Sequence, residues 1–322
     1  MRMPSATRRV RPRTLAEQEN RAGLVFIAPT LAVVVVAVLL PILWTVFIAF
    51  RELRLRDLRA VGVFGSSFTL ENFVNVLTSR GFLDAMITTV LYSLIGTMLA
   101  IGMGLAAALI VRRPFRGRTL VRASMLLPYV TPVVAVTFIW STMLDPNLGI
   151  VNAIGRDVFG WTKPIPFLSQ RAADVSVLGL HLELPVALIT VIVFQAWRYF
   201  PFAFLFLLAR LQAVPEDLDE AARVDGASPT QRFRYILLPQ LTGVIGLLVV
   251  LRFIWTFNEF DDIYLLTGGG AGTEVVSVRI FNQLTGRGDI GASAALSLVL
   301  AGLLCILLIL YFRRTSRGQS VP

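Results

Sequence analysis

Long stretches without a single charged side chain constrain this chain of 322 residues more than any other feature. Four intervals contain no Asp, Glu, Lys or Arg: 22–50, 85–111, 123–144 and 290–312. Two further apolar regions are interrupted by charge: 184–208 by Arg198, and 241–266 by Arg252, Glu259, Asp261 and Asp262. A helix needs about 20 mostly apolar residues to cross a bilayer. The sequence therefore predicts an all-α polytopic membrane protein with six transmembrane helices.

Composition excludes several other classes of protein. Hydrophobic residues make up 56% of the chain and charged residues 16%, whereas a soluble domain has about 25% charged residues. A net charge of +10 would suit a nucleic-acid binder, but the arginines form short clusters between apolar runs. That distribution is typical of membrane proteins, so we expect contacts with membrane lipid and none with nucleic acid.

Single cysteine and histidine residues limit the chemistry of the chain. Cys305 has no second cysteine with which to form an internal disulfide or a zinc cluster, and His181 has no second histidine for a metal site. We therefore predict structural roles for both residues and no metal site.

The distribution of basic residues predicts which side of the membrane each loop faces. Six spans place both termini on one side. If that side is the cytoplasm, the inner segments carry about twice as many Arg and Lys residues as the outer loops. The first span exceeds the roughly 7–15 residues of a signal-peptide core, so we expect it to be retained. The predicted parts are a cytoplasmic tail (1–21), a six-helix domain (22–312) and a second cytoplasmic tail (313–322).

The loop between the fourth and fifth spans, about 214–235, has the pattern of two short helices joined by a turn. Pro215 suits a first helical position, and acidic residues follow it at the positive end of a helix. Gly226 stands where a helix ends with a residue of positive φ. A capping box with a first-turn proline then starts the second helix: Ser228, Pro229 and Gln231.

The same loop carries the pattern by which the chain resembles the membrane permease subunits of ATP-binding-cassette importers. That family has Glu-Ala-Ala, a Gly four residues later, and Ile-x-Leu-Pro, which here are Glu220, Ala221, Ala222, Gly226, Ile236, Leu238 and Pro239. Two more stretches are similar to carbohydrate permeases of the maltose and glycerol-phosphate type: 197–202 (WRYFPF) and 255–270 (WTFNEFDDIYLLTGGG). Many of those permeases have Pro after the triple glycine, where Ala271 stands here.

The resemblance implies a type I importer permease fold over about residues 23–312, in a bacterial inner membrane. It also implies a complex with a second permease subunit, two copies of a cytoplasmic ATPase and an extracellular solute-binding protein. ATP and Mg²⁺ would bind to the ATPase, because this chain has no Gly-x-x-x-x-Gly-Lys-[Ser/Thr] pattern. No residue of the chain is expected to be catalytic.

In that family the loop lies in a cleft of the ATPase and transmits its closure to the membrane helices. The implied contacts are Glu220 as polar contact, Ala221 and Ala222 as the close-packed surface, Arg223 and Asp225 as auxiliary contacts, Gly226 as the turn, and Leu238 and Pro239 as the anchor to the fifth span.

Polar and aromatic residues of the spans are candidates for a solute pathway: Tyr129, Gln195, Tyr199, Trp255, Asn258, Glu259, Asp261 and Asp262. Charges within a membrane usually face a pathway or a partner. A continuous helix would place Trp255, Asn258 and Asp262 on one side, close to Glu259. The alternatives are a solvated end of the fifth span and hydrogen bonds between helices. Arg198 and Arg252 would then snorkel or pair with carboxylates.

The predicted function is translocation of a carbohydrate that an external binding protein delivers, driven by ATP hydrolysis in partner subunits. Two alternatives stay open. A glycerol-phosphate-type solute is disfavoured because the fifth span ends in carboxylates, whereas an anionic solute favours positive charge. A secondary transporter acting alone is disfavoured because the sequence shows no paired repeats.

Overall fold

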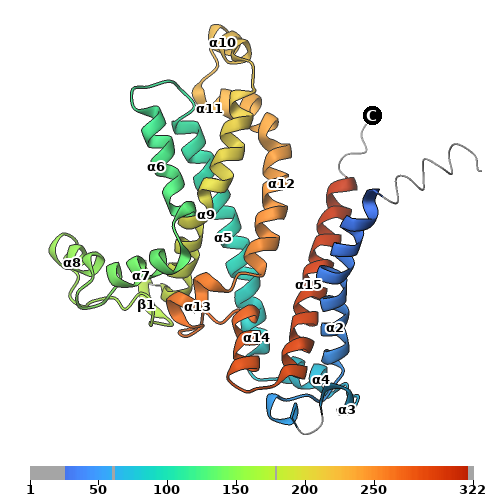
Figure 1. The fold of residues 1–322 in the computed structure, drawn as a ribbon. Coiled ribbons are helices and arrows are strands. Elements are labelled where there is room, and N and C mark those ends of the chain that lie inside the picture. Colours follow the sequence, from blue (N-terminus) through green and yellow to red (C-terminus); the bar gives the residue numbers. More distant parts are fainter. Residues whose placement is uncertain (1–25, 60–61, 178–179, 318–322) are drawn as a thin grey trace, which may run out of the picture.

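A computed structural model describes residues 26–59, 62–177 and 180–317, drawn in Figure 1. Within these ranges, five helices are long and apolar enough to cross a membrane: Phe26–Ala49, Phe82–Ile110, Val186–Gln212, Pro229–Phe257 and Ile290–Arg313. Helices α6 (Arg118–Val130) and α7 (Val133–Met143) pass the same test only as a pair, bent by 96°. Counting that pair as one crossing gives the six that the sequence predicts.

The third crossing is therefore not the straight helix expected over 123–144. After α6, Thr131 and Pro132 adopt extended backbone conformations, with ψ of 134° and 136°, before α7 begins. Proline has no amide hydrogen and disfavours a helical residue before it, so one helix does not run through this position. The expected helix over 123–144 rested only on the absence of charged residues, which gives no information about a bend at a proline.

The two ends of the molecule carry different elements (Figure 1). Helix α10 (Glu216–Val224) lies at the same end as the start of the first helix and the end of α15 (Ile290–Arg317). At the opposite end lie the short elements η2 (Leu55–Asp57), α3 (Gly62–Gly65), α4 (Glu71–Thr78), α8 (Ile150–Asp157), α13 (Asp261–Thr267) and α14 (Val276–Thr285). The chain crosses four times before α10 and six times before the end of α15, and an even number of crossings returns the chain to the end where the first helix starts.

The predicted tails are only partly described. The tail predicted at 1–21 lies outside the described residues. The tail predicted at 313–322 begins inside α15, which continues to Arg317, and residues 318–322 again lie outside the described part.

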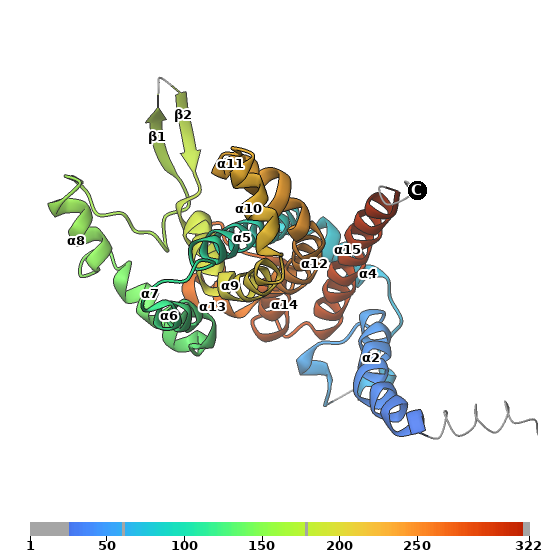
Figure 2. The same ribbon diagram turned by 90° about the horizontal axis from the view of Figure 1, so that it is seen from above.

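Among the described residues, one β-hairpin lies in the loop before the fourth crossing. Strand β1 (Ala173–Val177) pairs antiparallel with β2 (Leu180–Leu184), and Ala173 lies opposite Leu184. The hairpin points away from the bundle in Figure 2. His181 belongs to β2, but its side chain lies outside the described residues.

Helices α5 (Phe82–Ile110) and α9 (Val186–Gln212) form the centre of the bundle. Their contact uses small residues at every fourth position of α5, all of them buried: Gly96, Ala100, Gly104 and Ala108. A Cβ atom on Gly104 would lie 2.7 Å from the backbone nitrogen of Phe204. Small side chains of this kind let membrane helices approach closely.

The fifth crossing follows the predicted loop without a break. Helix α11 (Pro229–Arg232), the π-helical turn η3 (Phe233–Leu237) and α12 (Leu238–Phe257) form one continuous stretch. Pro239 cannot donate the hydrogen bond of a regular α-helix, which accounts for an irregular turn just before it.

The first crossing stands apart from this bundle. It contains a π-helical turn, η1 (Val35–Leu39), runs on into α2 (Leu40–Ala49) and packs against α15 (Figures 1 and 2). Its apolar side chains are largely exposed in the single chain, for example Leu43 at 67%. Such a surface suits lipid or another membrane helix.

Candidate functional site

The loop between the fourth and fifth crossings forms the two predicted helices and the predicted turn. Pro215 is the extended N-cap of α10, with ψ of 133°, and not its first helical residue. Gly226 has φ of +79°, as predicted. Its N–H donates to the carbonyl of Arg223 (3.0 Å), and the next amide donates to the carbonyl of Ala222 (2.9 Å). These two bonds form a Schellman motif, which fixes the end of α10.

The predicted capping box is also present. The side chain of Ser228 accepts from the backbone N–H of Gln231 (3.3 Å), and the Gln231 side chain accepts from the Ser228 N–H (2.7 Å). Before these two fixed points, α10 presents Glu220 and Ala221 to solvent, with Ala222 half-buried beside them. Asp225 is exposed at the end of the helix.

An ion-pair network that the sequence analysis missed holds the two helices together. Asp219 accepts from Arg223 (2.7 Å) and from Arg232 (3.0 Å), which joins α10 to α11. Partial burial raises the pKa of Asp219, but the hydrogen bond from Arg223 and the charge of Arg232 outweigh it, so its pKa lies below the ordinary value. The spacing of four residues between Asp219 and Arg223 was the available signal.

A hollow of about 400 Å³ opens beside this network. Its lining combines α10 with the loop that follows α5: Asp219, Glu220 and Arg223 with Arg112, Arg113 and Pro114. Glu220 therefore stands beside a basic loop at the same end of the molecule.

The anchor of the loop to the fifth crossing differs in detail from the prediction. Leu238 is half-buried and Pro239 is exposed, whereas Leu237 and Leu241 are buried in the apolar core. Arg210, near the end of α9, donates to the backbone and side-chain oxygens of Gln240, at 3.0 and 2.9 Å. These contacts attach the start of α12 to α9.

The end of the fifth crossing is not the continuous helix that we expected. Helix α12 ends at Phe257, and α13 begins at Asp261. The interpretation that Trp255, Asn258 and Asp262 share one face of a helix is therefore wrong. Asn258 caps α12, and its side chain donates to the carbonyl of Ile254 (2.9 Å).

The break separates neighbouring residues into two environments. Asp262 is completely buried, and its Oδ1 lies 3.4 Å from Nη1 of Arg198 on α9. Asp261 and Asn258 are exposed. Arg198 is therefore paired with a carboxylate, which is one of the two roles expected for it from the sequence. Asp261 and Asn258 remain accessible to a solute or a partner.

A buried polar cluster forms around this break. Gln195 of α9 donates to the hydroxyl of Thr256 (3.0 Å), and Arg252 donates to the same hydroxyl (3.0 Å). Tyr199 donates from its hydroxyl to Glu259 (3.2 Å). We call the polar cluster the set Gln195, Arg198, Tyr199, Arg252, Thr256, Glu259 and Asp262.

Aromatic side chains cover the polar cluster. The guanidinium carbon of Arg252 lies 4.1 Å from the ring centroid of Tyr199 and 5.9 Å from that of Trp255. Tyr129 meets Tyr199 edge-on at 6.2 Å, and Phe202 meets Trp255 edge-on at 5.1 Å. We call Tyr129, Tyr199, Phe202 and Trp255 the aromatic surface. Of the predicted pathway residues, only Asn258 and Asp261 stand clear of both sets.

Thr256 and Phe202 are members of these sets that the sequence analysis did not select. Thr256 follows Arg252 by one helical turn, which was a usable signal. Phe202 belongs to the stretch that resembles carbohydrate permeases, but an apolar residue in a span carries no signal of its own.

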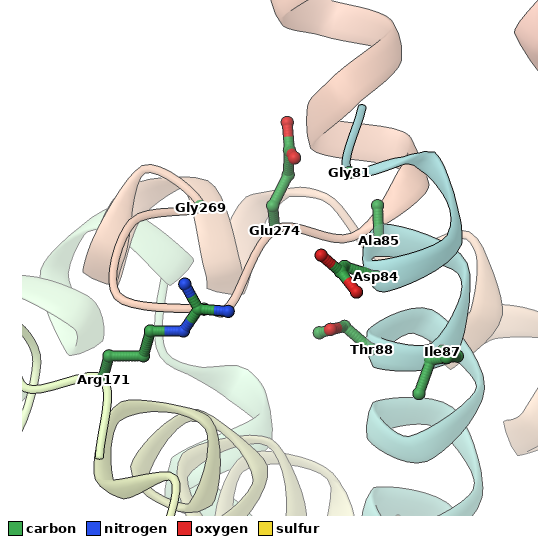
Figure 3. A pocket seen from close by; sticks show the side chains of 9 residues that line it. Gly81, Asp84, Ala85, Ile87, Thr88, Arg171, Gly269 and Glu274 are labelled. Carbon is green, nitrogen blue, oxygen red and sulfur yellow. The ribbon is translucent and has the colours of Figure 1, made fainter. Parts of the chain in front are cut away.

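At the opposite end, a second hollow of about 350 Å³ lies between α5 and the glycine-rich turn after α13. Asp84, Thr88 and Arg171 point into it in Figure 3, whereas Glu274 accepts from Arg279 (2.9 Å). Within the described ranges, no three His, Cys, Asp or Glu side chains are grouped to hold a metal ion. In the turn itself, Ala271 has φ of +51°, which a proline cannot adopt.

Comparisons with known proteins agree with this geometry. The model of the family "Binding-protein-dependent transport system inner membrane component" matches residues 96–317. The trehalose/maltose transport system permease protein MalF of Thermococcus litoralis is 33% identical over 302 residues, which are 93% of this chain and 95% of that protein. The inner membrane ABC transporter permease protein YcjO of Escherichia coli is 32% identical over 294 residues, 91% of this chain and 94% of that protein.

One further relative and one solved structure are also similar to this chain. The sn-glycerol-3-phosphate transport system permease protein UgpA of Rhizobium meliloti is 32% identical over 246 residues, 75% of this chain and 78% of that protein. A chain of a bacterial ABC transporter that imports the acidic polysaccharide alginate has the same fold, with a TM-score of 0.77 at 21% identity, over 95% of this chain and 99% of that one. The chain belongs to the family of inner membrane components of binding-protein-dependent ABC transport systems.

Proposed function

We propose that this permease subunit carries a neutral carbohydrate across the membrane and receives its driving force through the α10–α11 loop. The observation that carries this proposal is the shape of the loop. Helix α10 is fixed at its end by the Schellman motif, and it presents Glu220 and Ala221 to solvent at the end of the molecule. A rigid exposed helix of this kind fits a cleft in a cytoplasmic ATPase.

The coupling path runs from α10 to the membrane helices. Asp219 ties α10 to Arg232 of α11, and α11 continues into α12 without a break. Arg210 ties the start of α12 to α9 through Gln240. A movement of α10 would therefore be passed to both α9 and α12, which hold the polar cluster between them.

The proposed orientation places α10 and both chain ends in the cytoplasm. In support, the loop after α5 and the segments around α10 are rich in arginine, as cytoplasmic loops are. Two copies of an ATPase would then bind ATP and Mg²⁺ beneath this subunit and a second permease subunit. A solute-binding protein would dock at the end where α13 and α14 lie.

The proposed solute is a carbohydrate because of the side chains that remain open. The aromatic surface offers ring faces, with Trp255 46% and Tyr129 42% exposed. Asn258 and Asp261 add exposed hydrogen-bonding groups nearby in the chain. The alternative, an anionic glycerol-phosphate-type solute, has support in the relative UgpA, but the exposed carboxylate of Asp261 opposes it.

The test of coupling is ATP hydrolysis by the purified complex in lipid vesicles, with and without solute-loaded binding protein. Glu220→Ala removes a charged contact worth about 1.5–3 kcal/mol when it is desolvated on docking. We expect stimulated hydrolysis to fall about 10- to 100-fold. Asp217→Ala, which removes another exposed carboxylate of α10, is the matched control and should change little. Equal activity of the two variants and the wild type would overturn the coupling role.

The solute class is tested in the same vesicles. We expect uptake of a labelled neutral disaccharide or trisaccharide that the binding protein retains. Uptake of labelled glycerol 3-phosphate, with no uptake of any neutral sugar, would establish the alternative.

A further inference from the structure

Arg252 is the largest side chain that is fully buried in the described part of the protein. It is only 2% exposed and belongs to α12, which lies in a helical stretch long and apolar enough to cross the membrane. A charged side chain at such a place is costly and usually has a function. Because it is buried, Arg252 does not touch a solute itself.

The surroundings of Arg252 show what it acts on. Its Nη2 donates to Thr256 (3.0 Å), whose hydroxyl also accepts from Gln195 (3.0 Å). Its guanidinium carbon lies over the ring of Tyr199, at 4.1 Å from the centroid, and near Trp255, at 5.9 Å. One hydrogen bond, from Nη2 to Thr256, therefore holds Arg252 on one side, and the rings of Tyr199 and Trp255 lie on the other.

Those two rings belong to the aromatic surface. Trp255 is 46% exposed and meets Phe202 edge-on, whereas Tyr199 is half-buried and meets Tyr129. The hydroxyl of Tyr199 is held by Glu259 as well. Arg252 thus lies directly behind the side chains that would meet the solute.

We infer that Arg252 is a positioning residue for solute recognition: it holds the rings of Tyr199 and Trp255 at the angle that a passing sugar requires. This inference rests on the proposed carbohydrate pathway. Stacking on a sugar depends on the orientation of a ring, and a cation at about 4 Å behind an aromatic face restricts that orientation.

An arginine suits this task better than a lysine. Its planar guanidinium can stack on a ring while its edge donates hydrogen bonds, whereas the ammonium of lysine is a point charge without a plane. Arg252→Lys therefore keeps the charge but loses the stacking, and Arg252→Met keeps much of the side-chain volume but loses both.

The experiment measures two quantities on the same reconstituted complex, with binding protein and carbohydrate at saturation: ATP hydrolysis, and the number of solute molecules moved per ATP. We expect Arg252→Met to keep stimulated hydrolysis within about twofold of the wild type while transport per ATP falls about tenfold. Arg252→Lys should lower that ratio about threefold. A purely structural role would lower both quantities together.

Tyr199 supplies an independent arm. Tyr199→Phe keeps the ring that Arg252 contacts and loses only the hydroxyl bond to Glu259, so it should lower transport per ATP by much less than Tyr199→Leu. Tyr199→Leu should lower it about as much as Arg252→Met. Because both act through one contact, the double variant Arg252→Met with Tyr199→Leu should show no further loss. Arg56→Met, an exposed arginine in an outer loop, controls for the loss of a positive charge.

The outcomes are distinct. An unchanged ratio in Arg252→Met, or a parallel fall of hydrolysis and transport, overturns the inference. If Arg252→Met does not assemble, the tyrosine pair decides, and equal ratios for Phe and Leu overturn it. A wild-type complex that moves no carbohydrate at all overturns the proposed function instead.

Discussion

The α10–α11 loop and the polar cluster both concentrate charged residues, but they hold them in different ways. In the loop, Asp219 meets Arg223, four residues away, at 2.7 Å, and Arg232, 13 residues away, at 3.0 Å. In the polar cluster, Arg198 and Asp262 come from different helices, and their nearest atoms are 3.4 Å apart. The loop is ordered by local hydrogen bonds, whereas the polar cluster exists only after α9, α12 and α13 have packed together.

Burial makes the energetic consequences differ as well, because the Arg223 side chain in the loop is 51% exposed, whereas the Asp262 side chain in the polar cluster is completely buried. An exposed ion pair contributes little to stability, commonly about 0–1 kcal/mol. A buried pair is expensive to break, because removal of one partner leaves an uncompensated charge. We therefore expect changes in the loop to impair coupling while the protein stays folded, and changes in the polar cluster to impair folding or transport.

The largest expected effect is a difference in stability between variants of two adjacent residues, Asp262 and Asp261. Asp262→Ala leaves Arg198, whose side chain is 12% exposed, without its partner and should cost about 3–5 kcal/mol of stability. Asp261→Ala removes an exposed carboxylate, so the complex should purify intact while solute uptake falls, and Asn258→Ala should behave in the same way. Thermal unfolding of the purified complexes and uptake by vesicles measure the two effects.

A compensating pair sharpens that result. Replacing both partners, by Arg198→Met with Asp262→Leu, removes the two charges together and should recover much of the stability lost in Asp262→Ala. Equal stability of the Asp261→Ala and Asp262→Ala complexes would contradict the contrast between buried and exposed sites.

In the loop, the turn at Gly226 is the most sensitive position. Nothing lies within 4 Å of a Cβ atom built there, so a side chain would meet no steric obstacle. The backbone at φ of +79° is the only obstacle, and a β-branched residue should cost about 1–3 kcal/mol. Gly226→Val should therefore abolish most stimulation of ATP hydrolysis, while insertion and pairing with the second permease subunit stay normal.

Asparagine is the matched control for this turn, because it tolerates positive φ better than other side chains. Gly226→Asn should retain most of the stimulation. If Gly226→Val and Gly226→Asn are equally active, the conformation of the turn does not matter to coupling.

A smaller effect tests how tightly the polar cluster is packed. A Cβ atom on Gly96 of α5 would clash with the side-chain oxygen of Gln195. Gln195 is completely buried, and its side-chain nitrogen donates to the hydroxyl of Thr256. Gly96→Ala should cost about 1–3 kcal/mol of stability. Gly102→Ala on the same helix meets nothing within 4 Å and should change stability little. Equal unfolding temperatures for the two variants would show that Gln195 moves freely.

The smallest effect concerns pH. The pKa of Asp219 is lowered in the folded loop, so its ion pairs stabilise the loop above the ordinary value of 3.8 and are lost as pH falls through the lowered pKa. Hydrogen exchange of α10, compared between the wild type and Asp219→Asn, measures this. The wild type should be better protected near pH 6, and the difference should vanish at the acid end. A difference that persists there would contradict the ion-pair explanation.

Most of the loop could be predicted from the sequence. The positive φ of Gly226 and the capping box of Ser228 and Gln231 both follow from residues within one or two helical turns. Local hydrogen bonds of this kind need no distant partner. The bend at Pro132 was equally available to sequence reasoning, since proline acts on its own backbone.

The polar cluster could not be predicted in the same way. No glycine or proline marks the end of α12 at Phe257, and the break there coincides with contacts from distant residues. Tyr199 bonds the side chain of Glu259, and Ser277 bonds its carbonyl oxygen. The choice between Asp261 and Asp262 as partner of Arg198 likewise depends on where α13 lies.

By itself, then, the sequence determined the six candidate crossings, with the bent pair α6 and α7 counted as one, and the shape of the α10–α11 loop. Bilayer thickness and local hydrogen bonding act on short stretches of chain, which is why these features could be predicted. Only the tertiary structure decided which charges are buried together, which carboxylate faces outward, and that Arg252 lies behind the aromatic surface. Those outcomes depend on how α5, α9, α12 and α13 pack, and packing joins residues that are far apart in the chain.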